Sequence, residues 1–149
     1  MMDLGCFPPE LKKQAFEVGQ VLRMEMFESD GIKPKPGKSS KIKRFVILGK
    51  SNDSIVAALL INSQVNSNLQ SKIGPYQHKI LCKDYDFLDH DSFIDGFSLR
   101  QFDLERVSNN AEYLGRINDS DLQHGIDNVC DSPDTKPYLL KKFSLSHSK

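Results

Sequence analysis

The chain has 149 residues, of which 38% are hydrophobic and 27% charged, and its net charge is zero. This composition is typical of a soluble globular domain, and no apolar run reaches the roughly 18 residues that a membrane span needs. The N-terminus has no basic start followed by a long apolar run, so we expect no secretion signal. The three cysteines are too widely spaced to indicate a zinc site or a disulfide framework. We therefore predict a cytoplasmic protein with reduced thiols, no bound metal and no membrane segment.

The N-terminal half is predicted to contain a short helix and three strands. Residues 8–16 begin with two prolines and favour a helix. Residues 18–27 (VGQVLRMEMF) alternate between apolar and polar side chains, which indicates a strand. The apolar runs 44–48 (RFVIL) and 55–61 (IVAALLI) are separated by GKSNDS, so they predict a hairpin of two deeply buried strands.

A basic loop is predicted between the first strand and the hairpin. Residues 28–41 carry glycines and prolines that neither a helix nor a central strand tolerates, which predicts a long, mobile loop. The stretch 31–52 contains no acid, whereas acids predominate from 84 to 134. A polyanion would be attracted to the first stretch and repelled by much of the second. The alternative is that the basic loop is only a solvated surface. The basic residues of the stretch are Lys33, Lys35, Lys38, Lys41, Lys43, Arg44 and Lys50.

The C-terminal half is predicted to alternate between short strands and loops before one helix. A polar loop covers 62–75, and a helix begins at the capping sequence Asn118-Asp119-Ser120-Asp121 and runs to about Val129. We expect the remaining tail to be partly ordered. The predicted strands are 78–82, 92–94, 99–107 and 113–117.

Together these elements predict a mainly β fold. Several short strands with turns between them and one closing helix are typical of a small antiparallel barrel with a C-terminal helix and a short N-terminal helix. The predicted division is an N-terminal helical extension (1–17), one barrel domain (18–130) and a C-terminal tail (131–149).

Four stretches of the chain resemble the MazF/PemK family of ribonuclease toxins. The first is VGQVLRMEMF, with Gly19 at the position of the family's glycine, and the second is KRFVIL followed by IVAALLINS. The third runs from His78 to Val107, and the fourth is YLGRINDSDLQHGIDNV. Their order and spacing carry the resemblance over about residues 18–130.

The resemblance implies an SH3-like barrel that forms a homodimer and presents a concave surface to single-stranded RNA. Members of the family cut RNA without a metal, because the ribose 2′-hydroxyl attacks the adjacent phosphorus. The reaction needs a proton acceptor, positive charge on the phosphoryl oxygens and a donor at the leaving oxygen. The resemblance also implies a toxin whose partner is an acidic antitoxin peptide lying over the basic loop.

Carried onto this sequence, the family's catalytic arginine falls at Arg44 or at Lys43, depending on a one-residue choice of register. The family's hydroxyl residue falls at Leu60 in a strict match, and a slip of two or three residues brings Asn62 or Ser63 to this position. The candidate catalytic residues are therefore Arg44, Lys43, Ser63 and Asn62.

Candidate RNA-binding residues come from the basic loop and from the third stretch. They are Lys33, Lys35, Lys38, Lys41 and His78. His78 is also a candidate general base, and the alternative is a structural or surface histidine. Arg100, Arg106 and Arg116 either line a phosphate track or pair with nearby acids.

Two functions remain open at this point. The first is a metal-independent endoribonuclease acting on single-stranded RNA, as a toxin of a toxin–antitoxin pair. The second is a catalytically inactive SH3-like barrel that binds RNA or a protein partner. The chain contains no dinucleotide fingerprint, P-loop or nucleophile elbow, so we expect no cofactor.

Overall fold

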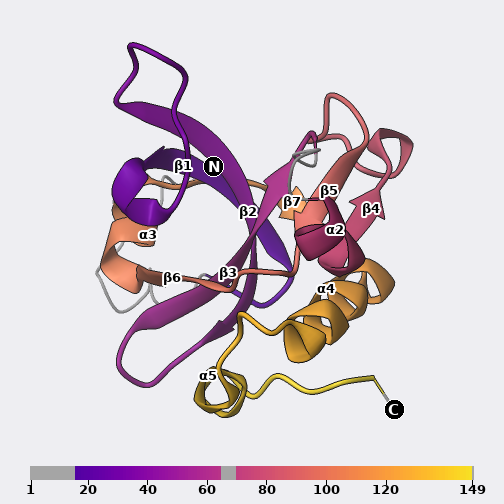
Figure 1. Cartoon of the computed structure of the whole chain (residues 1–149). Coiled ribbons are helices and arrows are strands. Elements are labelled where there is room, and N and C mark those ends of the chain that lie inside the picture. The colour runs from indigo at the N-terminus through magenta and orange to yellow at the C-terminus, as the bar shows by residue number, and fades with distance from the viewer. Residues whose placement is uncertain (1–15, 65–69, 149) are drawn as a thin grey trace.

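The computed structural model describes residues 16–64 and 70–148, so the helix expected over 8–16 lies, apart from its last residue, outside the described part of the chain. The described residues are mainly β and form one antiparallel sheet that curls into a half-barrel (Figure 1). In space the strands follow the order β4-β5-β3-β2-β1-β7, and β6 pairs with β3. The mainly β class and the C-terminal helix are thereby confirmed. The strands are β1 (Gln20–Phe27), β2 (Ser40–Lys50), β3 (Ile55–Asn62), β4 (Gln77–Ile80), β5 (Ser92–Asp95), β6 (Arg100–Asp103) and β7 (Glu112–Arg116).

Four α-helices and three short 3-10 helices connect or cover these strands in the described residues. The helices α4 and α5 lie together beside the sheet, whereas α3 lies at its other end, next to β6 (Figure 1). The α-helices are α2 (Gln70–Ile73), α3 (Leu104–Asn110), α4 (Asp119–Asp131) and α5 (Pro137–Lys142). The 3-10 helices are η2 (Glu28–Asp30), η4 (Gly74–Tyr76) and η5 (Cys82–Asp84).

Residues 45–49 of β2 and 56–61 of β3 are buried on both faces of the hairpin. Side chains alternate between the two faces of a strand, so Phe45 and Leu60 enter one core while Val46 and Leu59 enter the other. This two-sided burial explains why these parts of both strands lack polar side chains. The α3-side core includes Leu22, Met24, Met26, Ile32, Phe45, Ile47, Val56, Ala58, Leu60, Phe102, Leu104 and Val107. The α4-side core includes Val21, Val46, Leu48, Leu59, Ile61, Ile94, Ile126, Val129, Leu139, Phe143 and Leu145.

One edge of β3 is shared between two strands. β6 pairs with residues 55–58 of β3, and β5 pairs with residues 61–62. Leu60 therefore pairs with neither strand, although it is paired with Phe45 of β2 on the other edge. This change of partner brings the start of β6 and the end of β5 to the same part of the sheet.

The strand predicted over 99–107 is wrong in its second half. The extended backbone ends at Asp103, and Leu104 begins helix α3. Leu104 and Val107 are three residues apart, so a helical turn places both on one face, where both are buried in the α3-side core. In a strand, two residues that are three apart face opposite sides, so the spacing of Leu104 and Val107 fits a helix rather than a continued strand.

The C-terminal segment is more ordered than its sequence indicated. The predicted cap of α4 is confirmed, because Asn118 Oδ1 accepts a hydrogen bond from the backbone N–H of Asp121 at 2.7 Å. Beyond α4, the expected partly ordered tail instead forms α5 and buries Leu139, Phe143 and Leu145 in the α4-side core. No helix in the described residues is both long enough and apolar enough to cross a membrane.

Candidate anion-binding site

A pocket of about 270 Å³ lies where β3 changes partner, between β2, β3, β6 and the start of the β1–β2 loop. We call it the Lys43 pocket. Leu60 and Ile32 contribute apolar lining, and most of the other lining side chains are polar. The polar residues that line it are Lys33, Lys41, Lys43, Asn62, Gln64, Gln77, Asp95 and Arg100.

Lys43 reaches the pocket because of the register of the β2–β3 hairpin. Phe45 is paired with Leu60. Lys43 lies two residues before Phe45, and Asn62 lies two residues after Leu60, so both side chains share the face on which Phe45 and Leu60 lie. The ammonium nitrogen of Lys43 donates a short hydrogen bond to Asn62 Oδ1. This contact holds the amine between the ends of the two strands.

The environment of Lys43 disfavours its positive charge. The pKa of the Lys43 amine is lowered from 10.5 to about 8, mainly by partial burial and also by the nearby positive charges of Lys41 and Arg100. Asp95 opposes this effect, since its negative charge raises the pKa of Lys43. A substantial fraction of this amine is therefore neutral near physiological pH.

The pocket brings together more positive than negative charge. Its described lining carries the cations Lys33, Lys41, Lys43 and Arg100 and the single carboxylate Asp95. That carboxylate is already engaged, because Asp95 Oδ1 accepts hydrogen bonds from Gln77 Nε2 at 2.8 Å and from the backbone N–H of Phe97 at 3.0 Å. A bound anion would relieve the repulsion between the cations and would hydrogen-bond to them.

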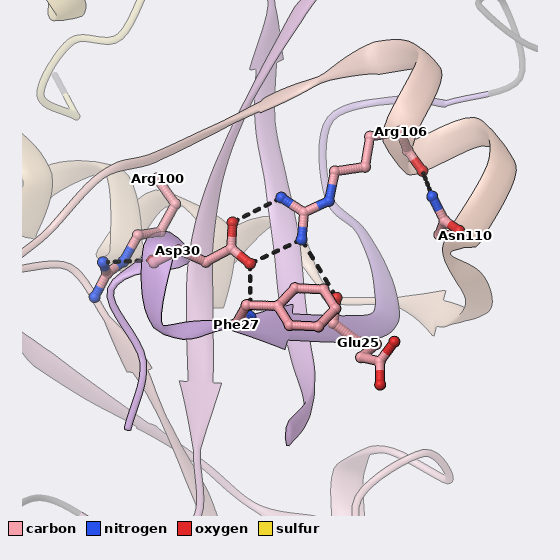
Figure 2. Close-up of polar contacts among 6 residues, drawn as sticks. All are labelled: Glu25, Phe27, Asp30, Arg100, Arg106 and Asn110. Carbon is pink, nitrogen blue, oxygen red and sulfur yellow. Dashed lines mark hydrogen bonds and ion pairs between the residues drawn. The ribbon is translucent and has the colours of Figure 1, made fainter. Parts of the chain in front are cut away.

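A second group of charges anchors the loop that carries Lys33. Asp30 accepts two hydrogen bonds from the guanidinium of Arg106, at 2.6 and 2.8 Å, and a third from the backbone N–H of Phe27 at 2.8 Å (Figure 2). Arg106 holds the pKa of the Asp30 carboxyl below its ordinary value of 3.8. We call this group the Asp30 cluster. It ties the first turn after β1 to helix α3.

Arg100 links the Asp30 cluster to the Lys43 pocket. Its Nη1 donates to the backbone carbonyl of Asp30 at 3.1 Å (Figure 2). Its side chain also lines the pocket. The next residue, Gly31, has a φ of 86° and packs directly against the Arg100 guanidinium, so a β-carbon at this position would be strained and would displace it. The loop thus depends on a glycine to place Arg100.

The structure brings together two of the four candidate catalytic residues and leaves the other two outside the pocket. Lys43 and Asn62 are brought together in the pocket. Arg44 points to the opposite face, where its Nη2 lies 3.3 Å from Asp89 Oδ2. Ser63 is exposed and follows the end of β3. Of the two registers left open for the catalytic cation, the pocket is therefore consistent with the one that selects Lys43.

The candidate RNA-binding residues are also divided. Lys33 and Lys41 line the pocket, while Lys35 and Lys38 are exposed on the same loop and do not line it. His78 lies elsewhere, on β4, with its Nε2 2.7 Å from Asp121 Oδ1 and its ring stacked on His124. These contacts give His78 a structural role between β4 and α4.

Some residues of the pocket were not among the candidates. For Arg100, Arg106 and Arg116, the sequence left open whether each contacts phosphate or pairs with an acid. Arg100 lines the pocket. The other two form ion pairs, Arg106 with Asp30 and Arg116 with Glu17. Asp95 and Gln77 were missed. The sequence holds no signal for them, because only sheet pairing brings β5 beside β3 and β4 beside β5.

Another hollow of the surface has the wrong charge for an anion. It measures about 470 Å³ and is lined by Asp53, Asp103, Glu105 and Arg106. Its carboxylates would repel a phosphate chain. Nowhere in residues 16–64 and 70–148 do three or more His, Cys, Asp or Glu side chains gather in a way that could hold a metal ion.

The Lys43 pocket is therefore the site defined by geometry and charge. Comparison with known proteins adds no assignment: no family model and no curated protein matches the chain.

Proposed function

We propose that the protein binds single-stranded RNA through the phosphodiester backbone in the Lys43 pocket and cleaves it there without a metal. The observation that carries this proposal is the gathering of Lys33, Lys41, Lys43 and Arg100 around one small hollow. Such a group of like charges is unfavourable by itself and becomes favourable when it binds an anion.

The size and layout of the pocket favour a phosphate within a chain. A volume of about 270 Å³ accommodates a phosphate with part of its nucleotide. Arg100 offers a planar guanidinium, which suits two phosphate oxygens. Lys33 and Lys41 line the pocket and are exposed, so they are placed to contact the bound phosphate and the neighbouring phosphates of a chain that continues beyond the pocket.

Lys43 has the protonation behaviour that metal-free cleavage requires. A neutral Lys43 amine accepts the proton of the ribose 2′-hydroxyl as its oxygen forms a bond to phosphorus, and the bond from phosphorus to the 5′-oxygen breaks. The resulting ammonium then returns a proton to the 5′-oxygen. Arg100 and Lys41 stabilise the negative charge on the phosphoryl oxygens. Because the pKa of Lys43 is about 8, cleavage increases with pH toward that value.

The wider features of the MazF/PemK resemblance belong to the same proposal. They are an SH3-like barrel, a cytoplasmic homodimer, and a toxin inhibited by an acidic antitoxin peptide. An acidic peptide would occupy the same cations as RNA and would compete with it.

The cleavage proposal is tested with a long single-stranded RNA in EDTA, with products separated on a denaturing gel. We expect the wild-type protein to cut the RNA and Lys43→Ala to lose at least about 100-fold in rate, as is usual when a general base is removed. Lys35→Ala removes the same charge from an exposed position outside the pocket and serves as the matched control. Equal cleavage by wild type and Lys43→Ala would contradict the proposed mechanism.

A second candidate function is RNA binding without cleavage. It is favoured by the position of Arg44, which pairs with Asp89 on the opposite face, so that β2 contributes no guanidinium to the pocket. This candidate predicts salt-sensitive RNA binding that Lys43→Ala weakens, with the RNA recovered intact.

A further inference from the structure

The amine of Lys43 differs from that of the other lysines of the basic loop. Lys33, Lys35, Lys38 and Lys41 are exposed, whereas Lys43 is partly buried and its nitrogen is held by Asn62 Oδ1. The amine also lies in a pocket large enough for a small molecule. It therefore combines a fixed position with access to a ligand.

A lysine attacks an electrophile only as the neutral amine. At about pH 7.5, an amine of pKa 8 is about one quarter neutral, while an ordinary lysine is only about 0.1% neutral. Partial burial is the main cause of this difference, and the charges of Lys41 and Arg100 add to it. The same cations thus favour the reactive form of Lys43.

The pocket also suits one class of electrophile. An acyl phosphate carries a reactive carbonyl carbon directly beside a phosphate, and phosphate is the group that Lys33, Lys41 and Arg100 are placed to bind. Binding of the phosphate among these cations would position the acyl carbon next to the Lys43 amine, because all four side chains line the same small hollow. An exposed lysine such as Lys35 has no such arrangement around it.

We propose that Lys43 is a site of acylation by acyl phosphates. The Lys43 nitrogen attacks the acyl carbon and forms a C–N bond, and the bond from that carbon to the phosphate oxygen breaks. Phosphate leaves with the electron pair, and the amine proton passes to the departing phosphate or to water. The product is an uncharged amide inside the pocket.

Acylation also changes what the pocket can bind. The amide removes one of the cations and fills part of the space, so it weakens binding of a phosphate chain. This consequence rests on the proposed function, whereas the acylation itself does not. Lys43 would thereby couple RNA binding to the supply of acyl phosphate.

The test is to incubate the full chain with acetyl phosphate and to follow each lysine by peptide mass spectrometry. At about pH 7.5 we expect Lys43 to be acetylated about tenfold or more faster than Lys35 and Lys38, because its neutral fraction is much larger. Inorganic phosphate should slow the acetylation of Lys43 and leave the acetylation rate of Lys35 unchanged. Equal rates at the three lysines, or a Lys43 rate that phosphate does not change, would overturn the proposal.

A variant separates phosphate binding from simple reactivity. Lys33 is exposed, so Lys33→Gln is expected to fold, and it should slow acetylation of Lys43 by acetyl phosphate but not by an N-hydroxysuccinimide ester, which carries no phosphate. Lys35→Gln is the matched control and should change neither rate. If Lys33→Gln slows both reagents equally, or neither, the phosphate-guided step is wrong.

RNA binding by the acetylated protein tests the consequence. Acetylated protein should bind RNA about tenfold or more weakly than the same preparation before treatment, since one phosphate contact is lost. Unchanged binding after modification would overturn the regulatory part of the inference. If the untreated protein binds no RNA at all while Lys43 is still acetylated selectively, the proposed function fails and the acylation site stands.

Discussion

The Asp30 cluster and the Lys43 pocket lie on either side of Arg100 and differ in how their charges are compensated. In the Asp30 cluster, a carboxylate with 9% of its side chain exposed meets a guanidinium through two hydrogen bonds and also accepts a backbone N–H. In the Lys43 pocket, cations outnumber carboxylates, and burial together with these cations lowers the pKa of Lys43. Compensated charges are explained by the stability of the fold, whereas uncompensated charges are better explained by a ligand.

The comparison predicts that mutations in the two regions change the stability of the protein in opposite directions. Removing a member of the Asp30 cluster leaves a partner unpaired and should destabilise the protein. Removing the charge of Lys43 relieves repulsion and burial of a cation, so it should stabilise the protein while function is lost. The following experiments test this contrast.

The largest effect on stability is expected for Asp30→Ala, which should lower the free energy of unfolding by about 2 kcal/mol because Arg106 and the Phe27 N–H lose their acceptor. The folded-state pKa of Asp30 lies below 3.8, so its contribution is present above that pH and is lost as pH falls through the folded value. Urea denaturation at neutral and acidic pH measures both effects. Glu28→Ala, an exposed neighbour, is the control, and a similar loss for both variants would contradict the role of the cluster.

A smaller effect of opposite sign is expected for Lys43→Met. The folded-state pKa of about 8 lies below the ordinary 10.5, so at neutral pH the folded protein bears the cost of a charged, partly buried amine. After allowance for solvent screening and the lost Asn62 hydrogen bond, we expect Lys43→Met to raise the free energy of unfolding by about 1 kcal/mol.

The pH dependence of this gain gives a second readout. Between pH 8 and 10.5 the unfolded state binds more protons than the folded state, so wild-type stability rises relative to the variant and the advantage of Lys43→Met shrinks. Denaturation curves at about pH 7 and about pH 10 measure the change. A variant that is less stable than wild type at neutral pH would remove the argument that Lys43 is costly to the fold.

The smallest effect is expected for Arg44→Gln. Its partner Asp89 has a side chain that is 76% exposed, and such surface ion pairs change stability by no more than about 0.5–1 kcal/mol. RNA binding should remain close to that of wild type, whereas Lys43→Gln, the matched variant one residue away, should weaken it strongly. If Arg44→Gln weakened RNA binding more than Lys43→Gln, the functional site would lie on the opposite face of the sheet.

Several elements of the fold could be predicted because their signals are local. The apolar runs of β2 and β3 and the capping sequence of α4 each contain their own evidence within about ten residues. The boundary between β6 and α3 could not be placed in this way. Leu104 fits both a strand that continues from Phe102 and a helical turn shared with Val107, and packing against the α3-side core decides between them.

By itself, the sequence determined that the chain is mainly β, that a buried hairpin follows a basic loop, and that cations are concentrated near Lys43. Only the tertiary structure decided which cations meet. Neighbouring residues of a strand face opposite sides of the sheet. Lys43 therefore lies in the pocket, and Arg44, the next residue, lies on the other face. Asp95 and Arg100 reach the same pocket from strands far along the chain, through sheet pairing that no local pattern encodes.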